Sequence, residues 1–142
     1  MSLALVDATL ADGSVATVRI ADGRIASVGA DGPQLLDTVL DLAGMLLLPA
    51  LAEPHAHLDK AFLAERIDNP TGDLMGAITA MAANRHLITA ADTVERAERA
   101  VRLLIRNGCT LIRTHADATT DNGLKSVEAL AEVRRRVAAD CD

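Results

Sequence analysis

Short runs of alternating apolar and polar residues fill the first 42 positions of the chain, and turn-forming pairs separate them. The runs are residues 3–10, 15–20 and 25–28, with Asp12-Gly13 and Asp22-Gly23 between them. Alternation is typical of strands with one buried face, and Asp-Gly between two such runs favours a hairpin turn. We therefore expect an antiparallel meander, followed after Asp31-Gly32-Pro33 by another strand over residues 35–42.

Beyond residue 70 the apolar positions take on the spacing of helices. Residues 74–82 show apolar positions three and four apart, and Asp73 before them is a suitable N-cap. A second apolar stripe covers residues 94–105 and is preceded by Thr89, which resembles the start of a capping box. Asn107-Gly108 is typical of a helix C-terminus. Two successive helices are therefore predicted between residues 73 and 107.

A short β-rich run, Cys109–Arg113, follows the second helix, and the apolar spacing of residues 124–137 predicts a last helix. The second helix also carries Glu95–Arg99 and Glu98–Arg102, which are favourable pairs four residues apart on its polar side. From residue 45 onward the predicted order is strand, helix, helix, strand, helix. This order is the start of a parallel α/β arrangement, in which sites lie at the carboxyl ends of buried strands.

The strongest chemical signal is a pair of histidines two residues apart, His55 and His57, in the segment Glu53-Pro54-His55-Ala56-His57-Leu58-Asp59-Lys60. The apolar run Met45–Leu51 precedes it and predicts a buried strand. Residues two apart on a strand point to the same face, so both imidazoles would reach one point. Imidazole binds zinc, iron, copper and nickel, but a catalytic zinc site usually has three protein ligands. The other ligands must therefore come from elsewhere.

Polar residues also end the second predicted strand, where His115 and Asp117 follow Arg113. Sites in parallel α/β folds lie at the carboxyl ends of strands, and these polar residues stand at such an end. A structural histidine that ties down the loop is the alternative interpretation of His115. The remaining histidine, His86, is interpreted as a cation at the C-terminus of a helix.

Composition excludes several classes of protein. The chain has 142 residues and a net charge of −6, and its acids and bases are interleaved, so no basic patch for nucleic acid is predicted. No apolar stretch reaches the ~18 residues that a membrane span needs. The two cysteines, Cys109 and Cys141, and the absence of a secretion signal predict a cytoplasmic protein. Phe62 is the only aromatic residue, so the core must consist of aliphatic side chains.

Taken together, these residues resemble the N-terminal part of an enzyme of the amidohydrolase superfamily, in its cytosine deaminase-like branch. Residues 49–59 and 108–117 carry the resemblance, and the intervening helices match in length and charge. The resemblance implies an α/β fold with a (β/α)8 barrel beside a small β-sandwich. Residues 1–48 would be the N-terminal part of the sandwich, and residues 49–142 the first βα units of the barrel. Members of the family are much longer, so we expect an incomplete fragment that ends where the third barrel strand would begin.

The resemblance also implies roles for individual residues. His55 and His57 match the metal-binding pair of the first barrel strand, and the metal would be a divalent zinc or iron ion. The residues that match the substrate pocket or the shell behind it are His115, Asp117, Asp59 and Lys60. Lys60 departs from cytosine deaminase itself, in which a small hydroxyl residue is usual. The remaining ligands and the catalytic acid and base lie on later strands in the family, so no catalytic residue is expected in this chain.

Several functions remain open from the sequence. The first is metal-dependent deamination of a cytosine-like nitrogen heterocycle, in which a metal-activated water attacks the ring carbon that carries the amino group. The second is hydrolysis of an N-substituted amino-triazine or another cyclic amide. A non-enzymatic interpretation is an inactive fragment that is stable only in association with the rest of the enzyme or with copies of itself. A small metal-binding module is a fourth.

Overall fold

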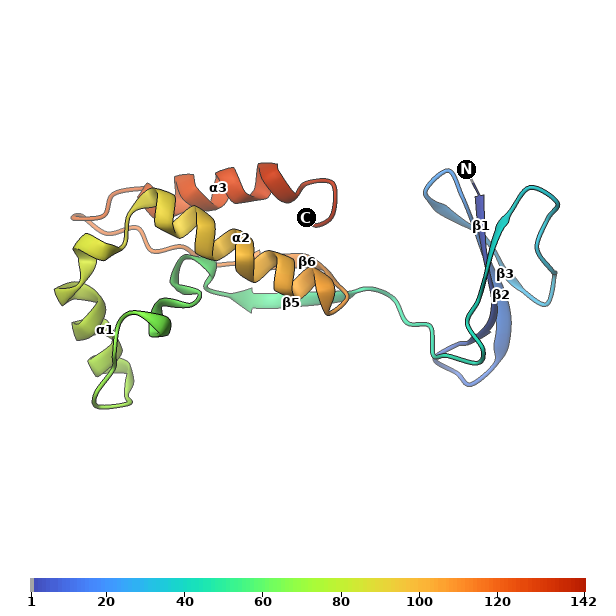
Figure 1. Ribbon diagram of the computed structural model, residues 1–142, viewed down its shortest axis with the longest axis horizontal. Helices are drawn as coiled ribbons and strands as arrows, with labels where there is room; N and C mark the ends of the chain where they lie inside the picture. The colour runs from blue at the N-terminus through green and yellow to red at the C-terminus, as the bar shows by residue number, and fades with distance from the viewer. Residues whose placement is uncertain (1) are drawn as a thin grey trace. The chain divides into compact units, whose positions relative to one another are not determined.

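The computed structural model describes residues 2–142, which form two units (Figure 1). The first unit ends at Pro49 and is a sheet of four strands, and the second begins at Ala50 and combines two strands with helices. Among the described residues, no helix combines the length and the apolar character that crossing a membrane requires.

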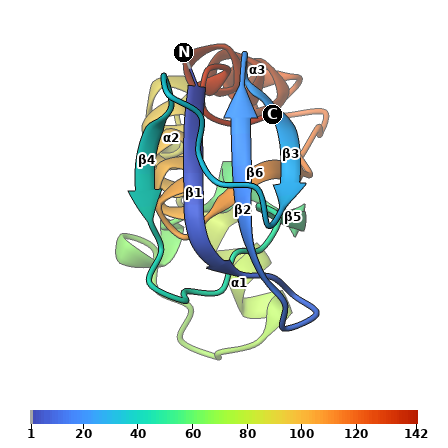
Figure 2. The same ribbon diagram turned by 90° about the vertical axis from the view of Figure 1, so that its right-hand side faces the viewer.

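The first unit contains β1 (Ser2–Thr9), β2 (Val15–Ala21), β3 (Arg24–Gly29) and β4 (Thr38–Asp41) in the order β3-β2-β1-β4 (Figure 2). The first three strands pair antiparallel along the chain, which confirms the predicted meander. Asp22 and Gly23 connect β2 to β3 with φ angles of 51° and 72°. Two positive φ angles are what a type I′ hairpin turn requires, so the Asp-Gly pair determines this connection.

The fourth strand is shorter than the sequence predicts. It covers Thr38–Asp41, not 35–42, and it lies parallel to β1. The segment before it crosses the sheet, and Asp37 there accepts two hydrogen bonds from Arg19 of β2, at 2.6 and 2.9 Å. The Asp37 side chain is 1% exposed, and the bound Arg19 guanidinium holds the pKa of this carboxyl well below its ordinary value. This ion pair ties the crossing segment to β2 directly before β4 begins.

The second unit is a parallel pair of strands with helices packed on it. The strands are β5 (Leu51–Ala56) and β6 (Cys109–Thr114), and the helices are α1 (Leu74–Ala83), α2 (Ala90–Arg106) and α3 (Lys125–Val137). Three 3₁₀ turns complete it: η1 (Leu58–Lys60), η2 (Leu63–Glu65) and η3 (Arg85–Leu87). The core lies where α2, α3 and η1 meet and contains Ala97, Val101, Leu130, Val133 and Leu58. Helix α1 contributes no buried residue.

The apolar run Met45–Leu51 is not the buried strand that its composition predicts. Met45, Leu46 and Leu48 are each more than half exposed, and the strand begins only at Leu51. The start of the run pairs with the first unit instead, because the Leu47 amide donates to the Thr9 carbonyl at 2.8 Å. The ladder of the second unit starts where the Leu51 amide meets the Gly108 carbonyl, at 2.9 Å. An apolar run with two such partners cannot be assigned to one strand from composition.

The predicted helix ends agree with the structure. The Asp73 side chain accepts a hydrogen bond from the Gly76 amide at 2.6 Å, and Thr89 accepts one from the Asp92 amide at 3.2 Å. Gly108 follows α2 with a φ of +82°. Of the two predicted pairs on α2, Glu98–Arg102 forms at 2.7 Å, whereas Arg99 binds Glu65 of η2 at 2.8 Å.

Asp142 continues the sheet of the second unit by one residue. The Ile112 amide of β6 donates to the Asp142 carbonyl at 2.8 Å, and the Asp142 amide donates to the Thr110 carbonyl at 3.0 Å. These bonds lie on the edge of β6 that β5 does not occupy. The segment after α3 therefore returns to the sheet beside β6.

Candidate functional site

The two histidines of the His-Ala-His segment meet at the carboxyl end of β5. His55 lies inside the strand, and His57 is the first residue after it. Their Nε2 atoms are 3.3 Å apart. Two imidazole nitrogens that bind one tetrahedral zinc at its usual bond length are about 3.3–3.4 Å apart. The backbone conformation of the strand end thus presents two nitrogens at the separation that a shared metal requires.

Glu53, which comes before the pair on β5, helps to fix this strand end. Its Oε1 atom accepts a hydrogen bond from the His55 amide at 2.9 Å. Thr114, at the end of β6, accepts a bond from the Leu58 amide at 3.1 Å. The neighbouring His115 amide donates to the Ala56 carbonyl at 2.8 Å. The ends of the two strands are therefore bonded to each other on both sides of His57.

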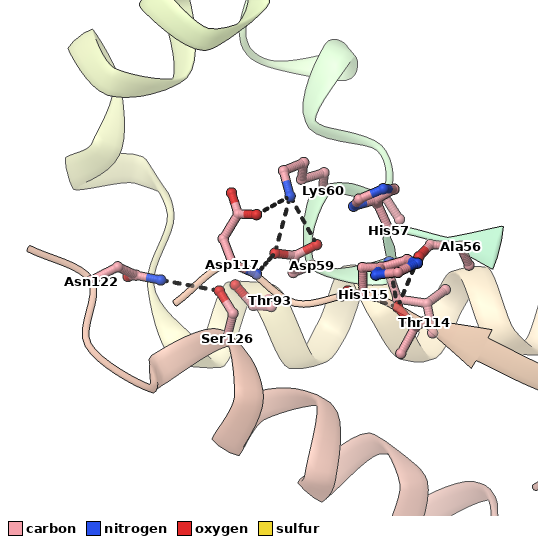
Figure 3. Close-up of polar contacts among 12 residues, drawn as sticks. Ala56, His57, Asp59, Lys60, Thr93, Thr114, His115, Asp117, Asn122 and Ser126 are labelled. Carbon is pink, nitrogen blue, oxygen red and sulfur yellow. Dashed lines mark hydrogen bonds and ion pairs between the residues drawn. The ribbon is translucent and has the colours of Figure 1, made fainter. Parts of the chain in front are cut away.

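His115 joins the pair from the end of β6. Its ring centroid lies 4.6 Å from that of His55 and 5.1 Å from that of His57, with the His57 ring stacked on it (Figure 3). Burial, and then the positive charge that His55 and His57 can take up, lower the pKa of His115. Within residues 2–142 no three His, Cys, Asp or Glu side chains converge closely enough to hold a metal ion. His115 is therefore a neighbour of the pair in this conformation, and the fit to a metal rests on His55 and His57.

Asp59, Lys60 and Asp117 form a second polar group beside the histidines (Figure 3). The Lys60 ammonium is 2.9 Å from the Asp117 carboxylate and 3.4 Å from that of Asp59. Asp59 also accepts a hydrogen bond from the Asp117 backbone amide at 2.9 Å. The side chains of Lys60 and Asp117 are 27% and 56% exposed, whereas that of Asp59 is 4% exposed. Lys60 and Asp117 can therefore reach a small molecule, while Asp59 acts as their support.

One residue of this region escaped the sequence analysis. Arg96 of α2 is 5% exposed and donates hydrogen bonds to the backbone carbonyls of Asp59 and Ala61. It also binds the carboxylate of Asp92, one turn earlier. The signal for it is an Asp-Arg pair four residues apart on the side of α2 that carries the buried Ala97 and Ala100. His86 lies in η3, on a different segment from the three site histidines.

Comparison with known proteins gives sequence and structural relatives, although no family model matches the chain. It is 35% identical over 121 residues to pterin deaminase of Rhizobium rhizogenes (strain K84 / ATCC BAA-868), a match that covers 84% of this chain and 28% of that protein. The structure of 5-methylcytosine deaminase from Klebsiella pneumoniae has a TM-score of 0.83 and 31% identity, over 100% of this chain and 35% of that one.

N-isopropylammelide isopropylaminohydrolase from Burkholderia multivorans ATCC 17616 also has a TM-score of 0.83, with 26% identity over 100% of this chain and 36% of that one. The chain thus spans between 28% and 36% of the length of these three relatives. Across that length, both strand ends and the connections between them have counterparts in enzymes of known structure.

Proposed function

We propose that this chain, which belongs to the amidohydrolase superfamily, carries part of the metal-binding site of an enzyme that hydrolyses a C–N bond of a nitrogen heterocycle. The observation that carries the proposal is the 3.3 Å separation of the His55 and His57 Nε2 atoms at the carboxyl end of β5. In this proposal β5 and β6 are the first two strands of a (β/α)8 barrel, whose sites lie at that end. The first unit is the N-terminal part of a small β-sandwich.

His55 and His57 would hold a divalent zinc or iron ion, which lowers the pKa of a bound water towards 7 and so supplies hydroxide. Glu53 holds the His55 backbone in place, and the strand pairing at Ala56 keeps His57 beside it. His115 closes one side of the pair, and burial lowers the pKa of its ring, which favours the neutral form. A neutral imidazole there adds no positive charge beside the cation.

Lys60 and Asp117 would bind the ring of the substrate. The ammonium of Lys60 donates hydrogen bonds, and the carboxylate of Asp117 accepts them. A heterocycle with a ring carbonyl beside a ring N–H presents the matching acceptor and donor. Amino-substituted pyrimidines and pterins have this pattern, so deamination of such a ring is the first candidate reaction.

Hydrolysis of an N-substituted amino-triazine is the second candidate, and Lys60 favours it. A lysine places a full positive charge where cytosine deaminase carries a small hydroxyl residue. Triazine rings with several carbonyl groups lose ring protons readily, and a cation stabilises the anion that results. The similarity to N-isopropylammelide isopropylaminohydrolase is consistent with this choice.

The test compares histidine variants in a protein in which this chain is followed by the further barrel strands that its longer relatives contain. His55→Ala and His57→Ala should each remove most of the bound metal, and turnover of aminopyrimidines, pterins or amino-triazines should fall by about 10²-fold or more. His86→Ala is the matched control, because it removes a histidine from η3 and should change neither quantity. Full metal content and normal turnover in the double variant would show that this pair is not the metal site.

A further inference from the structure

One side chain of α2 forms hydrogen bonds to the turn that carries Lys60. Arg96 projects from α2, and its Nη1 atom donates to the carbonyl of Asp59 at 3.1 Å and to that of Ala61 at 2.7 Å. These carbonyls belong to the residues immediately before and after Lys60. Within η1 itself, the Lys60 and Ala61 amides each donate to one carbonyl, those of His57 and Leu58. The guanidinium therefore supplies about as many bonds to this turn as the turn makes internally.

Two side chains of the same helix hold Arg96 itself in place. Its Nε atom donates to the Asp92 carboxylate at 2.9 Å, and its Nη2 atom lies 3.3 Å from the Thr93 hydroxyl. Arg66 binds the second carboxylate oxygen of Asp92. A guanidinium is planar and stays charged in proteins, so the buried Arg96 keeps a fixed direction through its four hydrogen bonds. The backbone of the turn consequently has one defined place relative to α2.

We propose that Arg96 is a positioning residue that sets the place of the Lys60 ammonium in the site. The chain of contacts runs from α2 through Arg96 to the two carbonyls, and from there along Lys60 to Asp117. Without the two hydrogen bonds from Arg96, the peptide on either side of Lys60 can turn, and the ammonium then moves away from the carboxylates of Asp59 and Asp117. The consequence for catalysis rests on the proposed function, because only there does Lys60 bind substrate.

The two lysines of the chain, Lys60 and Lys125, make this position measurable without any substrate. Lys125 is exposed, whereas Lys60 is 27% exposed and paired with two carboxylates. Limited acetylation with acetic anhydride, followed by mass spectrometry of the peptides, gives the ratio of the two labelling rates. We expect Arg96→Met to raise the Lys60 to Lys125 ratio about tenfold, the size of losing one hydrogen bond to a charged group.

Two variants separate positioning from general destabilisation. Arg102→Met removes an exposed arginine that binds Glu98 on the same helix, and it should leave the labelling ratio unchanged. Arg96→Lys keeps the positive charge and one donor nitrogen in place of three, so Lys60 should be labelled more slowly than in Arg96→Met. Amide exchange in α3 should be the same in all three variants.

An unchanged ratio in a folded Arg96→Met chain, or an equal rise in Arg102→Met, would overturn the proposal. If Arg96→Met does not fold, Thr93→Val serves instead, since it keeps the shape of Thr93 and removes its hydroxyl from Nη2. The ratio should then rise about threefold, as for a weaker neutral contact, and no rise would overturn the proposal. The labelling is measured in metal-free protein, so this outcome is independent of the histidine test.

Discussion

The two units differ in how far apart in the sequence their contacts lie. In the first unit, β1, β2 and β3 pair with their neighbours along the chain through short turns. In the second unit, the site depends on bonds between residues such as Leu58 and Thr114, 56 positions apart, and Asp59 and Asp117, 58 apart. Local sequence determines the first kind of geometry, whereas helix packing must bring the second kind together. The candidate site residues therefore lie in the unit whose geometry depends on contacts between distant residues.

The largest expected effect comes from a charge in the core of the second unit. Val133 of α3 is 2% exposed, so Val133→Asp places a carboxylate without a partner between α2 and α3. We expect this unit to lose about 4 kcal/mol of stability, since an uncompensated buried charge costs that much. Val127→Asp, at a position 42% exposed on the same helix, is the control. Amide exchange resolved by residue should show protection lost beyond residue 50 and kept in β1 and β2.

The second prediction concerns association of the chain with itself, which we expect because β5 and β6 form a parallel sheet of only two strands among the described residues. Leu111 on β6 is 53% exposed and lines an apolar hollow of about 430 Å³ beside α3. Open strand edges and exposed apolar surface both favour pairing between chains.

Sedimentation should therefore show oligomers, and Leu111→Lys should shift the distribution towards monomer. Leu36→Lys changes an even more exposed leucine of the first unit, at 88%, and should have no such effect. A monodisperse monomer with well-protected amides in β6 would show that the second unit is self-sufficient.

Acid should act on the first unit through Asp37. Its pKa is lowered in the folded state by the Arg19 hydrogen bonds, so its contribution to stability is present above its unfolded pKa, near 4. That contribution should disappear as the pH falls from about 4 towards the folded pKa. Asp37→Asn should lower the stability of the first unit at pH 7 and remove this part of its acid dependence, as amide exchange of β2 and β4 can show. An unaltered acid profile in the variant would contradict the assignment.

The smallest expected effects are those of the helix caps. Thr89→Ala removes the hydroxyl that accepts from the Asp92 amide, and this should cost about 1 kcal/mol in the second unit. Asp73→Ala removes the equivalent bond of α1, which has no buried residue, so only α1 should fray. Equal losses of global stability from the two changes would show that α1 is coupled to the core.

Features set by neighbouring residues could be predicted from the sequence. The Asp22-Gly23 turn, the Asp73 and Thr89 caps and Gly108 after α2 all have their expected roles. The resemblance to the amidohydrolase superfamily is confirmed as well. The sequence also predicts polar residues at the carboxyl ends of two strands, and in the structure His115 lies beside His55 and His57.

Features set by distant contacts could not be predicted. Strand β4 pairs with β1, and Asp37 just before it binds Arg19, but neither residue signals these contacts within its own segment. The apolar run Met45–Leu51 divides its bonds between Thr9 and Gly108, which periodicity cannot indicate. Arg96 resembles the other arginines of α2, and only the packing of η1 on that helix buries it.

The bond from the Asp117 backbone amide to Asp59 has a consequence for how such a site can evolve. Any residue except proline supplies that amide, so the loop after β6 stays anchored whatever side chain occupies position 117. If residue 117 binds the ring of the substrate, as the proposed function has it, its side chain can be exchanged and the recognition of the ring altered without loosening the strand ends. Asp59 has no such freedom, because its carboxylate is the anchor. Over a lineage, substrate preference could thus diverge at one position while its neighbour in space is held constant.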